Sequence, residues 1–186
     1  MAEVLANPTL PESVDVMART LFGEASGCGV SAMQHVAMVI MNRVNHPKWW
    51  GHDVISVCQE PWQFSCWNKS DPNRARILAA TEADGWFAVA VSIAYKAIGG
   101  NLPDVTDDAD SYYALSMAHP PAWASRGTKT FSDQWHAFYR LENPLPGVKP
   151  EDPHAPTVSV HSIAAPTPDP APAEDPADAL DAEYNK

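Results

Sequence analysis

An amphipathic pattern over residues 13–29 restricts the chain to a fold built on a helix, and it ends in a single carboxylate. Apolar residues recur there at intervals of three and four, the spacing of one helical face, and they are Val14, Met17, Ala18, Leu21 and Phe22. Ser13 is a suitable N-cap, and the glycines at 27 and 29 are typical of a helix end. Glu24 lies three residues after Leu21. The pattern therefore predicts a helix with a carboxylate at the end of its buried face.

On such a face, Glu24 would have two physical reasons to keep its proton. Burial disfavours the charged form, and the C-terminal end of a helix carries partial negative charge. A carboxyl group with a raised pKa suits a general acid. The alternative is a frayed last turn that leaves Glu24 in solvent. Helical periodicity alone does not decide between a catalytic acid and a solvated surface residue.

Helical patterns fill the chain from residue 31 to residue 98, and strand-forming residues follow them. The predicted helices cover residues 31–46, where Ser31 and Gln34 form a capping box, and residues 53–58, 71–83 and 87–98. Residues 111–115 and 130–140 predict two short paired strands. The aspartates of residues 101–110 lack the spacing of an EF-hand and predict a solvated loop. The expected fold class is mainly α with a small antiparallel β element.

Composition changes after residue 144. Residues 145–186 contain 9 of the 18 prolines, 2 Lys against 8 Asp and Glu, and no Trp or Phe. Such a segment cannot bury enough apolar surface to offset chain entropy. We therefore expect one folded domain over residues 1–144 and a disordered tail rich in Pro, Ala and acidic residues over residues 145–186.

Charge and composition exclude several functions. The net charge of −11 and the absence of Lys and Arg runs argue against a nucleic acid partner, and no apolar run is long enough to span a membrane. The first residues lack the pattern of a secretion signal, so we expect synthesis in the cytoplasm. Cys28, Cys58 and Cys66 match neither a zinc pattern nor a disulfide framework, and a bridge between Cys58 and Cys66 stays open.

Residues 59–68 interleave aromatic side chains with amide and hydroxyl groups. Sugar-binding sites need this combination, because pyranose rings present both C–H faces and hydroxyls; a core-lining loop would show the same residues. Other chemistries have weaker support: no His-Glu-x-x-His zinc motif or Gly-x-Ser-x-Gly elbow is present, and Cys28 only loosely fits a thiol nucleophile. Acid/base chemistry at Glu24, with no metal or cofactor, remains.

Five motifs in order resemble the SleB/CwlJ family of cell wall hydrolases. They are Ala-Arg-Thr-Leu-Phe-Gly-Glu-Ala at 18–25, Val-Ala-Met-Val-Ile-Met-Asn-Arg-Val at 36–44, Gln-Phe-Ser at 63–65, Tyr-Tyr at 112–113 and Trp-His-Ala-Phe-Tyr at 135–139. The resemblance implies a lysozyme-like catalytic domain that cleaves peptidoglycan between N-acetylmuramic acid and N-acetylglucosamine, with Glu24 as the catalytic acid. The family also includes bacteriophage endolysins, so we expect a monomeric lysis enzyme that acts at the cell wall after release through the inner membrane.

The resemblance also implies a set of substrate-binding residues, which are Gln63, Ser65, Trp67, Tyr113 and His136. Each could instead satisfy buried groups of the fold. A lytic transglycosylase can work with one carboxyl group, whereas a hydrolytic muramidase or glucosaminidase usually needs two. Asp53 and Asp71 are better explained as helix caps, and Glu60 stays open as a second carboxylate. A non-catalytic peptidoglycan-binding module is the alternative from a different class.

Overall fold

The computed structural model describes residues 10–141, so the predicted tail and its boundary at residue 144 lie outside the described residues. The helices are α1 (Glu12–Ala25), α2 (Val30–Asn45), α3 (Val54–Gln59), α4 (Arg74–Ala79) and α5 (Gly85–Ile98). The strands are β1 (Ser111–Ala114), β2 (Thr128–Ser132) and β3 (His136–Arg140). A short 3₁₀ helix, η2 (Ser65–Trp67), lies between α3 and α4. The fold is mainly helical with one small antiparallel sheet, and the expected fold class is confirmed.

Helices α1, α2 and α5 form the core of the helical body, and α3 and α4 pack beside α1. The predicted apolar face of α1 is buried, with Met17 and Leu21 fully enclosed, and Phe22 meets Phe87 of α5 edge to face. Nearly every side chain of α2 from residue 32 to residue 40 is buried. A helix that is apolar on most sides belongs in the interior, and α2 accordingly packs against α1, α3 and α5.

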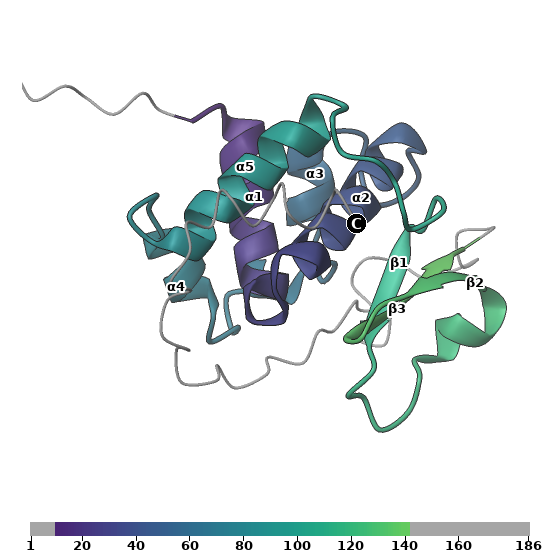
Figure 1. Cartoon of the computed structure of the whole chain (residues 1–186). Coiled ribbons are helices and arrows are strands. Elements are labelled where there is room, and N and C mark those ends of the chain that lie inside the picture. Colours follow the sequence, from purple (N-terminus) through teal and green to yellow (C-terminus); the bar gives the residue numbers. More distant parts are fainter. Residues whose placement is uncertain (1–9, 142–186) are drawn as a thin grey trace, which may run out of the picture.

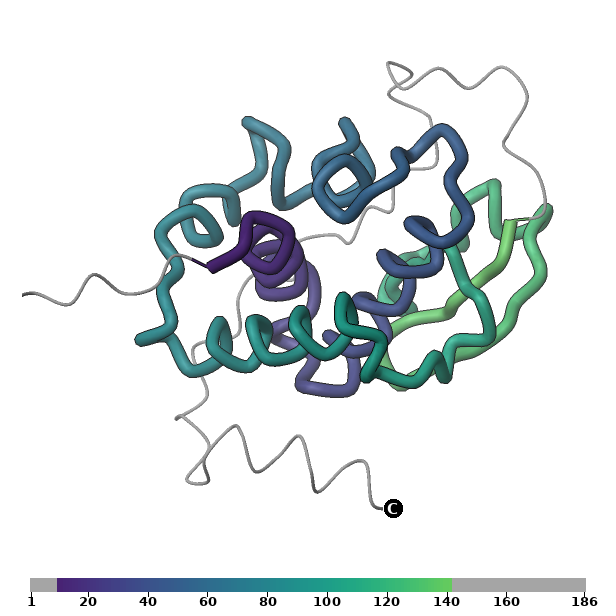
Figure 2. Tube along the Cα trace, turned by 90° about the horizontal axis from the view of Figure 1, so that it is seen from above, coloured from purple at the N-terminus to yellow at the C-terminus, as the bar shows by residue number. Residues whose placement is uncertain are grey.

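The three strands lie together at one end of the helical body (Figures 1 and 2). They pair in the order β1-β3-β2, and both pairings are antiparallel. The prediction of a single strand over residues 130–140 is wrong, because a turn that contains Asp133 and Trp135 divides it into β2 and β3. The sheet therefore has three strands where two were expected.

Helix starts differ from the prediction at three places. Helix α1 begins at Glu12 after Pro11, so Ser13 is not its N-cap. The expected capping box at Ser31 is absent, since α2 starts after Gly29, which has a φ of 91°. Helix α4 covers only Arg74–Ala79, and Asp71 accepts from the backbone N–H of Asn73 in a turn that precedes it. The prediction that Asp53 caps a helix is confirmed: it is the N-cap of α3 and forms a capping box with Ser56.

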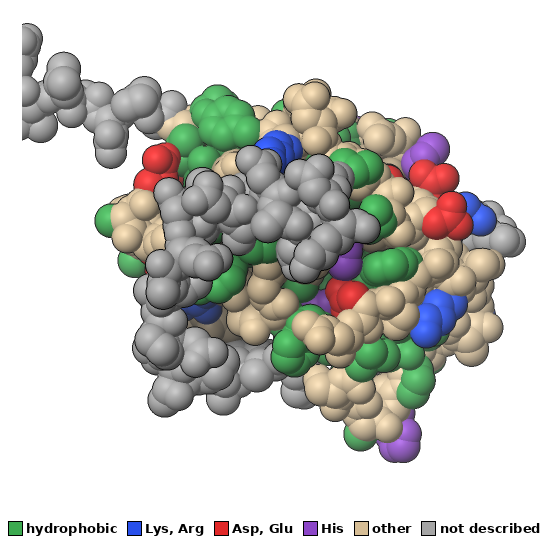
Figure 3. Space-filling view, viewed as in Figure 1, with side chains coloured by type: hydrophobic (Ala, Val, Ile, Leu, Met, Phe, Trp, Pro, Cys, Tyr) green, Lys and Arg blue, Asp and Glu red, His purple; other side chains and the backbone are tan. Residues whose placement is uncertain are grey.

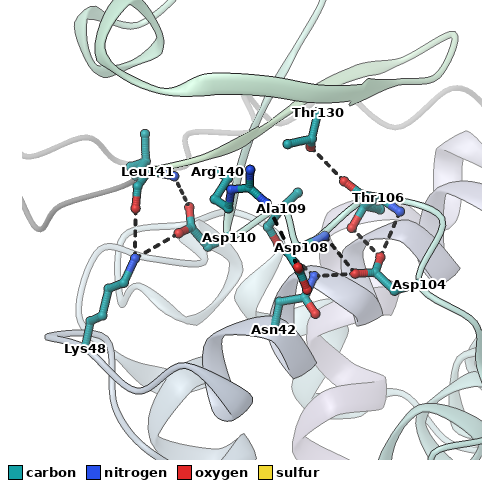
Figure 4. A network of polar contacts seen from close by, with 10 residues as sticks. All are labelled: Asn42, Lys48, Asp104, Thr106, Asp108, Ala109, Asp110, Thr130, Arg140 and Leu141. Atoms are coloured by element: carbon teal, nitrogen blue, oxygen red, sulfur yellow. Dashed lines mark hydrogen bonds and ion pairs between the residues drawn. The ribbon is translucent and has the colours of Figure 1, made fainter.

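The aspartate-rich loop joins the helical body to the sheet (Figure 4). Asp104 accepts from Asn42 Nδ2 at 2.9 Å, and Asp110 accepts from Lys48 Nζ at 3.2 Å and from the N–H of Leu141 at 3.0 Å. Asp110 is buried. The expectation of a solvated loop is therefore wrong at Asp110, which is buried and satisfies backbone and side-chain donors at the junction. Asp104 is exposed, as expected, although it accepts from Asn42.

Candidate active site

Glu24 lies in the last turn of α1 and is 6 % exposed. One carboxylate oxygen, Oε2, accepts from the phenol O–H of Tyr112 at 3.2 Å, and Oε1 accepts from the backbone N–H of Cys66 at 3.5 Å. The acid and its two donors therefore come from α1, η2 and β1. A buried carboxyl group is thus held where the helical body meets the sheet.

Gly23 lets η2 approach α1 closely enough to contact Glu24. A Cβ at position 23 would lie 2.7 Å from the Cβ of Cys66 and 3.0 Å from Ile77 Cγ2, closer than side chains tolerate. On the same side of α1, the indole N–H of Trp67 donates to Thr20 Oγ1 at 2.9 Å. The glycine of the Gly-Glu-Ala motif therefore allows α1 and η2 to pack closely beside the glutamate.

Burial raises the pKa of Glu24 from its ordinary value of 4.5 to about 7. The hydrogen bonds from Cys66 and Tyr112 favour the carboxylate and oppose this rise, and the negative charge of Asp71 adds to it. Burial also raises the pKa of Tyr112 well above its ordinary value, so the phenol stays protonated and donates. Near neutral pH, Glu24 can therefore give a proton and take one back.

The ring of His136 packs against the ring of Tyr112. The two rings meet edge to face with centroids 5.3 Å apart, and His136 is itself 1 % exposed. Asp133 lies 3.6 Å from Nδ1 of His136 and 2.8 Å from Nδ1 of His35 on α2. Burial alone would raise the pKa of Asp133, but the contacts with both histidines and hydrogen bonds from the backbone N–H groups of Trp135 and His136 hold it far below the ordinary range. The Asp133 carboxylate therefore stays ionised, and its contacts connect His136 of β3 with His35 of α2.

The other residues expected in the substrate site differ in burial. Gln63 is buried and accepts from Nη1 of Arg43 at 3.4 Å, and His136 supports Tyr112 as described. Trp67 packs half-buried against the core, while Ser65 opens η2 and is also half-buried. Whether any of them contacts substrate stays a prediction.

Tyr113 lies away from Glu24. Adjacent residues of a strand point to opposite faces of the sheet, and Tyr113 packs with Trp123 and Tyr139 in a separate cluster. The expected role of Tyr113 in substrate binding stays a prediction, and the sequence did not indicate that Tyr112 and Cys66 donate hydrogen bonds to Glu24. Side chains alternate along β1, so Tyr112 and Ala114 share one face and Tyr113 lies on the other. Two consecutive tyrosines in the sequence do not show which of them faces Glu24.

The thiols are poorly suited to nucleophilic chemistry. Burial raises the pKa of Cys58 to about 12, and burial and the charge of Asp133 raise the pKa of Cys28. All three cysteines are free.

Within residues 10–141, no group of three or more His, Cys, Asp or Glu is arranged to hold a metal ion, and no helix is long and apolar enough to cross a membrane.

Charged side chains are scattered singly or in mixed pairs on the face shown in Figure 3, without a broad patch of one sign. A neutral polymer would meet no electrostatic penalty on such a face, whereas a polyanion would find no concentrated positive charge to bind.

Comparisons with known proteins agree with this fold. A family model described as Cell Wall Hydrolase matches residues 27–139, a range that begins three residues after Glu24. The structure is similar to the catalytic domain of the germination-specific lytic transglycosylase SleB from Bacillus anthracis, with a TM-score of 0.52 and 23 % sequence identity. The similarity covers 73 % of this chain and 100 % of that domain. At this identity the likeness shows a shared fold. No curated protein sequence matches the chain significantly.

Proposed function

The chain belongs to the cell wall hydrolase family, and from that premise we propose that it cleaves the glycan strands of peptidoglycan between N-acetylmuramic acid and N-acetylglucosamine. Glu24 acts as both general acid and general base in a lytic transglycosylase reaction. The observation that carries the proposal is the burial of this single carboxyl group, whose pKa of about 7 lets it exchange a proton at neutral pH.

In the first step, protonated Glu24 gives its proton to the glycosidic oxygen as the bond from that oxygen to C1 of the muramic acid breaks. The N-acetylglucosamine side leaves as an alcohol, and positive charge develops at C1. The Glu24 carboxylate then takes the proton of the C6 hydroxyl as its oxygen bonds to C1, which gives a 1,6-anhydro end and restores the acid. The donors on Tyr112 and Cys66 stabilise the carboxylate between the two steps.

Hydrolysis is the second candidate, and one observation favours it. Asp71 does not cap α4, whose N-cap is Asn73, and its charge acts on Glu24. A second carboxylate beside the acid is what a hydrolytic muramidase or glucosaminidase uses to direct water. Glu60, whose pKa burial raises, is the other candidate for this role.

The test compares Glu24→Gln with a matched control, Glu12→Gln, which makes the same change at an exposed position of the same helix. Glu24→Gln should abolish the release of soluble fragments from purified peptidoglycan, and Glu12→Gln should retain it. Mass spectrometry of the fragments separates the candidates: anhydro ends indicate transglycosylation, and hydrated reducing ends indicate hydrolysis. Full activity of Glu24→Gln would refute the role of Glu24. Binding by the wild type without fragment release would indicate a non-catalytic module.

The proposal includes a biological role, host lysis by a bacteriophage, which rests on the resemblance of the sequence motifs to a family with endolysin members. Such an enzyme collects inside the host and reaches the wall once the inner membrane is opened. Bacteria that express the protein should therefore lyse after chloroform treatment, and bacteria that express Glu24→Gln should not. Unchanged turbidity of the wild-type culture after treatment would count against this role.

A further inference from the structure

Trp62 occupies a turn position that normally requires glycine. Residues 60–63 form a turn closed by a hydrogen bond from the N–H of Gln63 to the carbonyl of Glu60 at 3.1 Å. Pro61 takes the second position, and Trp62, with a φ of 67°, takes the third. This is the pattern of a type II turn, in which the third residue is usually Gly or Asn. A tryptophan there is held in a conformation that side chains with a Cβ disfavour.

Burial does not compensate for the strain at Trp62, because its side chain is 42 % exposed. The residues that follow it are anchored in the core instead. Gln63 is 2 % exposed and contacts Arg43, and the ring of Phe64 packs under the Arg43 guanidinium at 5.4 Å. The residues after the turn are therefore anchored in the core, while Trp62 itself leaves a large apolar ring exposed to solvent.

The exposed ring is also close to the candidate acid. Trp62 precedes Cys66 by four residues, and the N–H of Cys66 contacts Glu24. Four residues of fully extended chain span about 14 Å at most, so the backbone of Trp62 lies within a few sugar rings of the reacting bond. Trp67, the tryptophan expected to stack on a sugar, instead uses its indole N–H to bind Thr20 and packs against the core.

We propose that Trp62 is a stacking platform for a hexosamine ring of the glycan strand, within a few rings of the cleavage point. The inference rests on the proposed function, since it names a binding residue for the same substrate. A sugar ring has an apolar C–H face that an exposed indole can cover, and a rigid indole loses little conformational freedom when it binds. The strained turn is thereby explained, because it holds the ring in place before substrate arrives.

The test uses Trp62→Gly, which removes the indole and also relieves the left-handed conformation. A structural role predicts a lower unfolding midpoint for this variant. A binding role predicts an equal or higher midpoint together with weaker binding, about 3- to 10-fold by the usual value of an aromatic contact. Trp62→Phe should recover most of the binding. Tyr95→Ala, a loss of another exposed ring on α5, is the control and should bind as the wild type does.

Binding is measured in the Glu24→Gln background by pelleting with glycan strands stripped of their stem peptides, so that it does not depend on turnover. Weaker binding of Trp62→Gly to these strands supports the inference even if the wild type releases no fragments, in which case only the catalytic proposal fails. Equal binding of Trp62→Gly and its parent overturns the inference. A defect seen only with intact stem peptides also overturns it, because the contact would then be to peptide.

Discussion

Replacing Glu24 by glutamine should stabilise the folded protein at alkaline pH. In the unfolded chain this carboxyl group titrates near its ordinary pKa of 4.5, whereas burial raises the pKa to about 7 in the folded protein. The folded state therefore binds the proton more tightly than the unfolded state. The contribution of Glu24 to stability is therefore greatest below pH 4.5, falls as the pH rises towards 7, and stays low above it.

The magnitude follows from the interval between the two pKa values. Each pH unit corresponds to about 1.4 kcal/mol, so ionised Glu24 costs the folded protein about 3 kcal/mol at pH 8. Glutamine has nearly the same shape and never ionises. Glu24→Gln should thus be more stable than the wild type by up to about 3 kcal/mol at pH 8, and this advantage should fall below about 1 kcal/mol at pH 5.

The assay is urea unfolding of both proteins at intervals from pH 4.5 to pH 8.5. Glu12→Gln removes the same charge from an exposed position and should not reproduce the pH-dependent gain. The reasoning would be refuted by a stability difference between Glu24→Gln and wild type that stays constant across this range, because the carboxyl group would then not be desolvated in the folded state.

Three further substitutions test contacts around the site. Tyr112→Phe keeps the ring but removes a hydrogen bond that favours the Glu24 carboxylate, so the alkaline limb of the pH–activity profile should move up by about one pH unit; an unchanged limb would contradict the contact. Gly23→Ala forces a Cβ against Cys66 and should lower stability by about 1–3 kcal/mol in thermal or urea unfolding, whereas a neutral effect would show that the two segments can separate at no cost. Asp110→Ala leaves buried donors without an acceptor and should cost about 1–3 kcal/mol; full stability would mean that water replaces the carboxylate.

The helical part of the fold could be predicted because its signals are local. The buried face of α1 and the position of Glu24 on it follow from a repeat within a few turns. Capping signals were less reliable. At Ser31 the motif was present, but the preceding glycine sets the start of α2, and at Asp71 the short helix begins only after Asn73. Local motifs compete with neighbouring turns, and the sequence does not show which one prevails.

The surroundings of Glu24 could not be predicted, because they depend on contacts between distant segments. Tyr112 and Tyr113 are equivalent in the sequence, and only the register with β3 places the first of them at the acid. Likewise, Trp62 and Trp67 belong to one aromatic stretch, but the turn at Pro61 exposes the former and the packing against Thr20 covers the latter. Composition singled out the stretch whose Cys66 contacts Glu24, but it could not identify the side that each residue presents.

The two hydrogen bonds to Glu24 also bear on how the protein folds. One joins residues 42 positions apart, and the other joins residues 88 positions apart. Contacts within a helix form quickly, whereas contacts across long loops wait for much of the chain to be ordered. During refolding, helical circular dichroism should therefore recover before catalytic activity does. Glu24 gains the hydrogen bond from Tyr112 only when the sheet docks on the helices. A partly folded chain should therefore not yet degrade peptidoglycan.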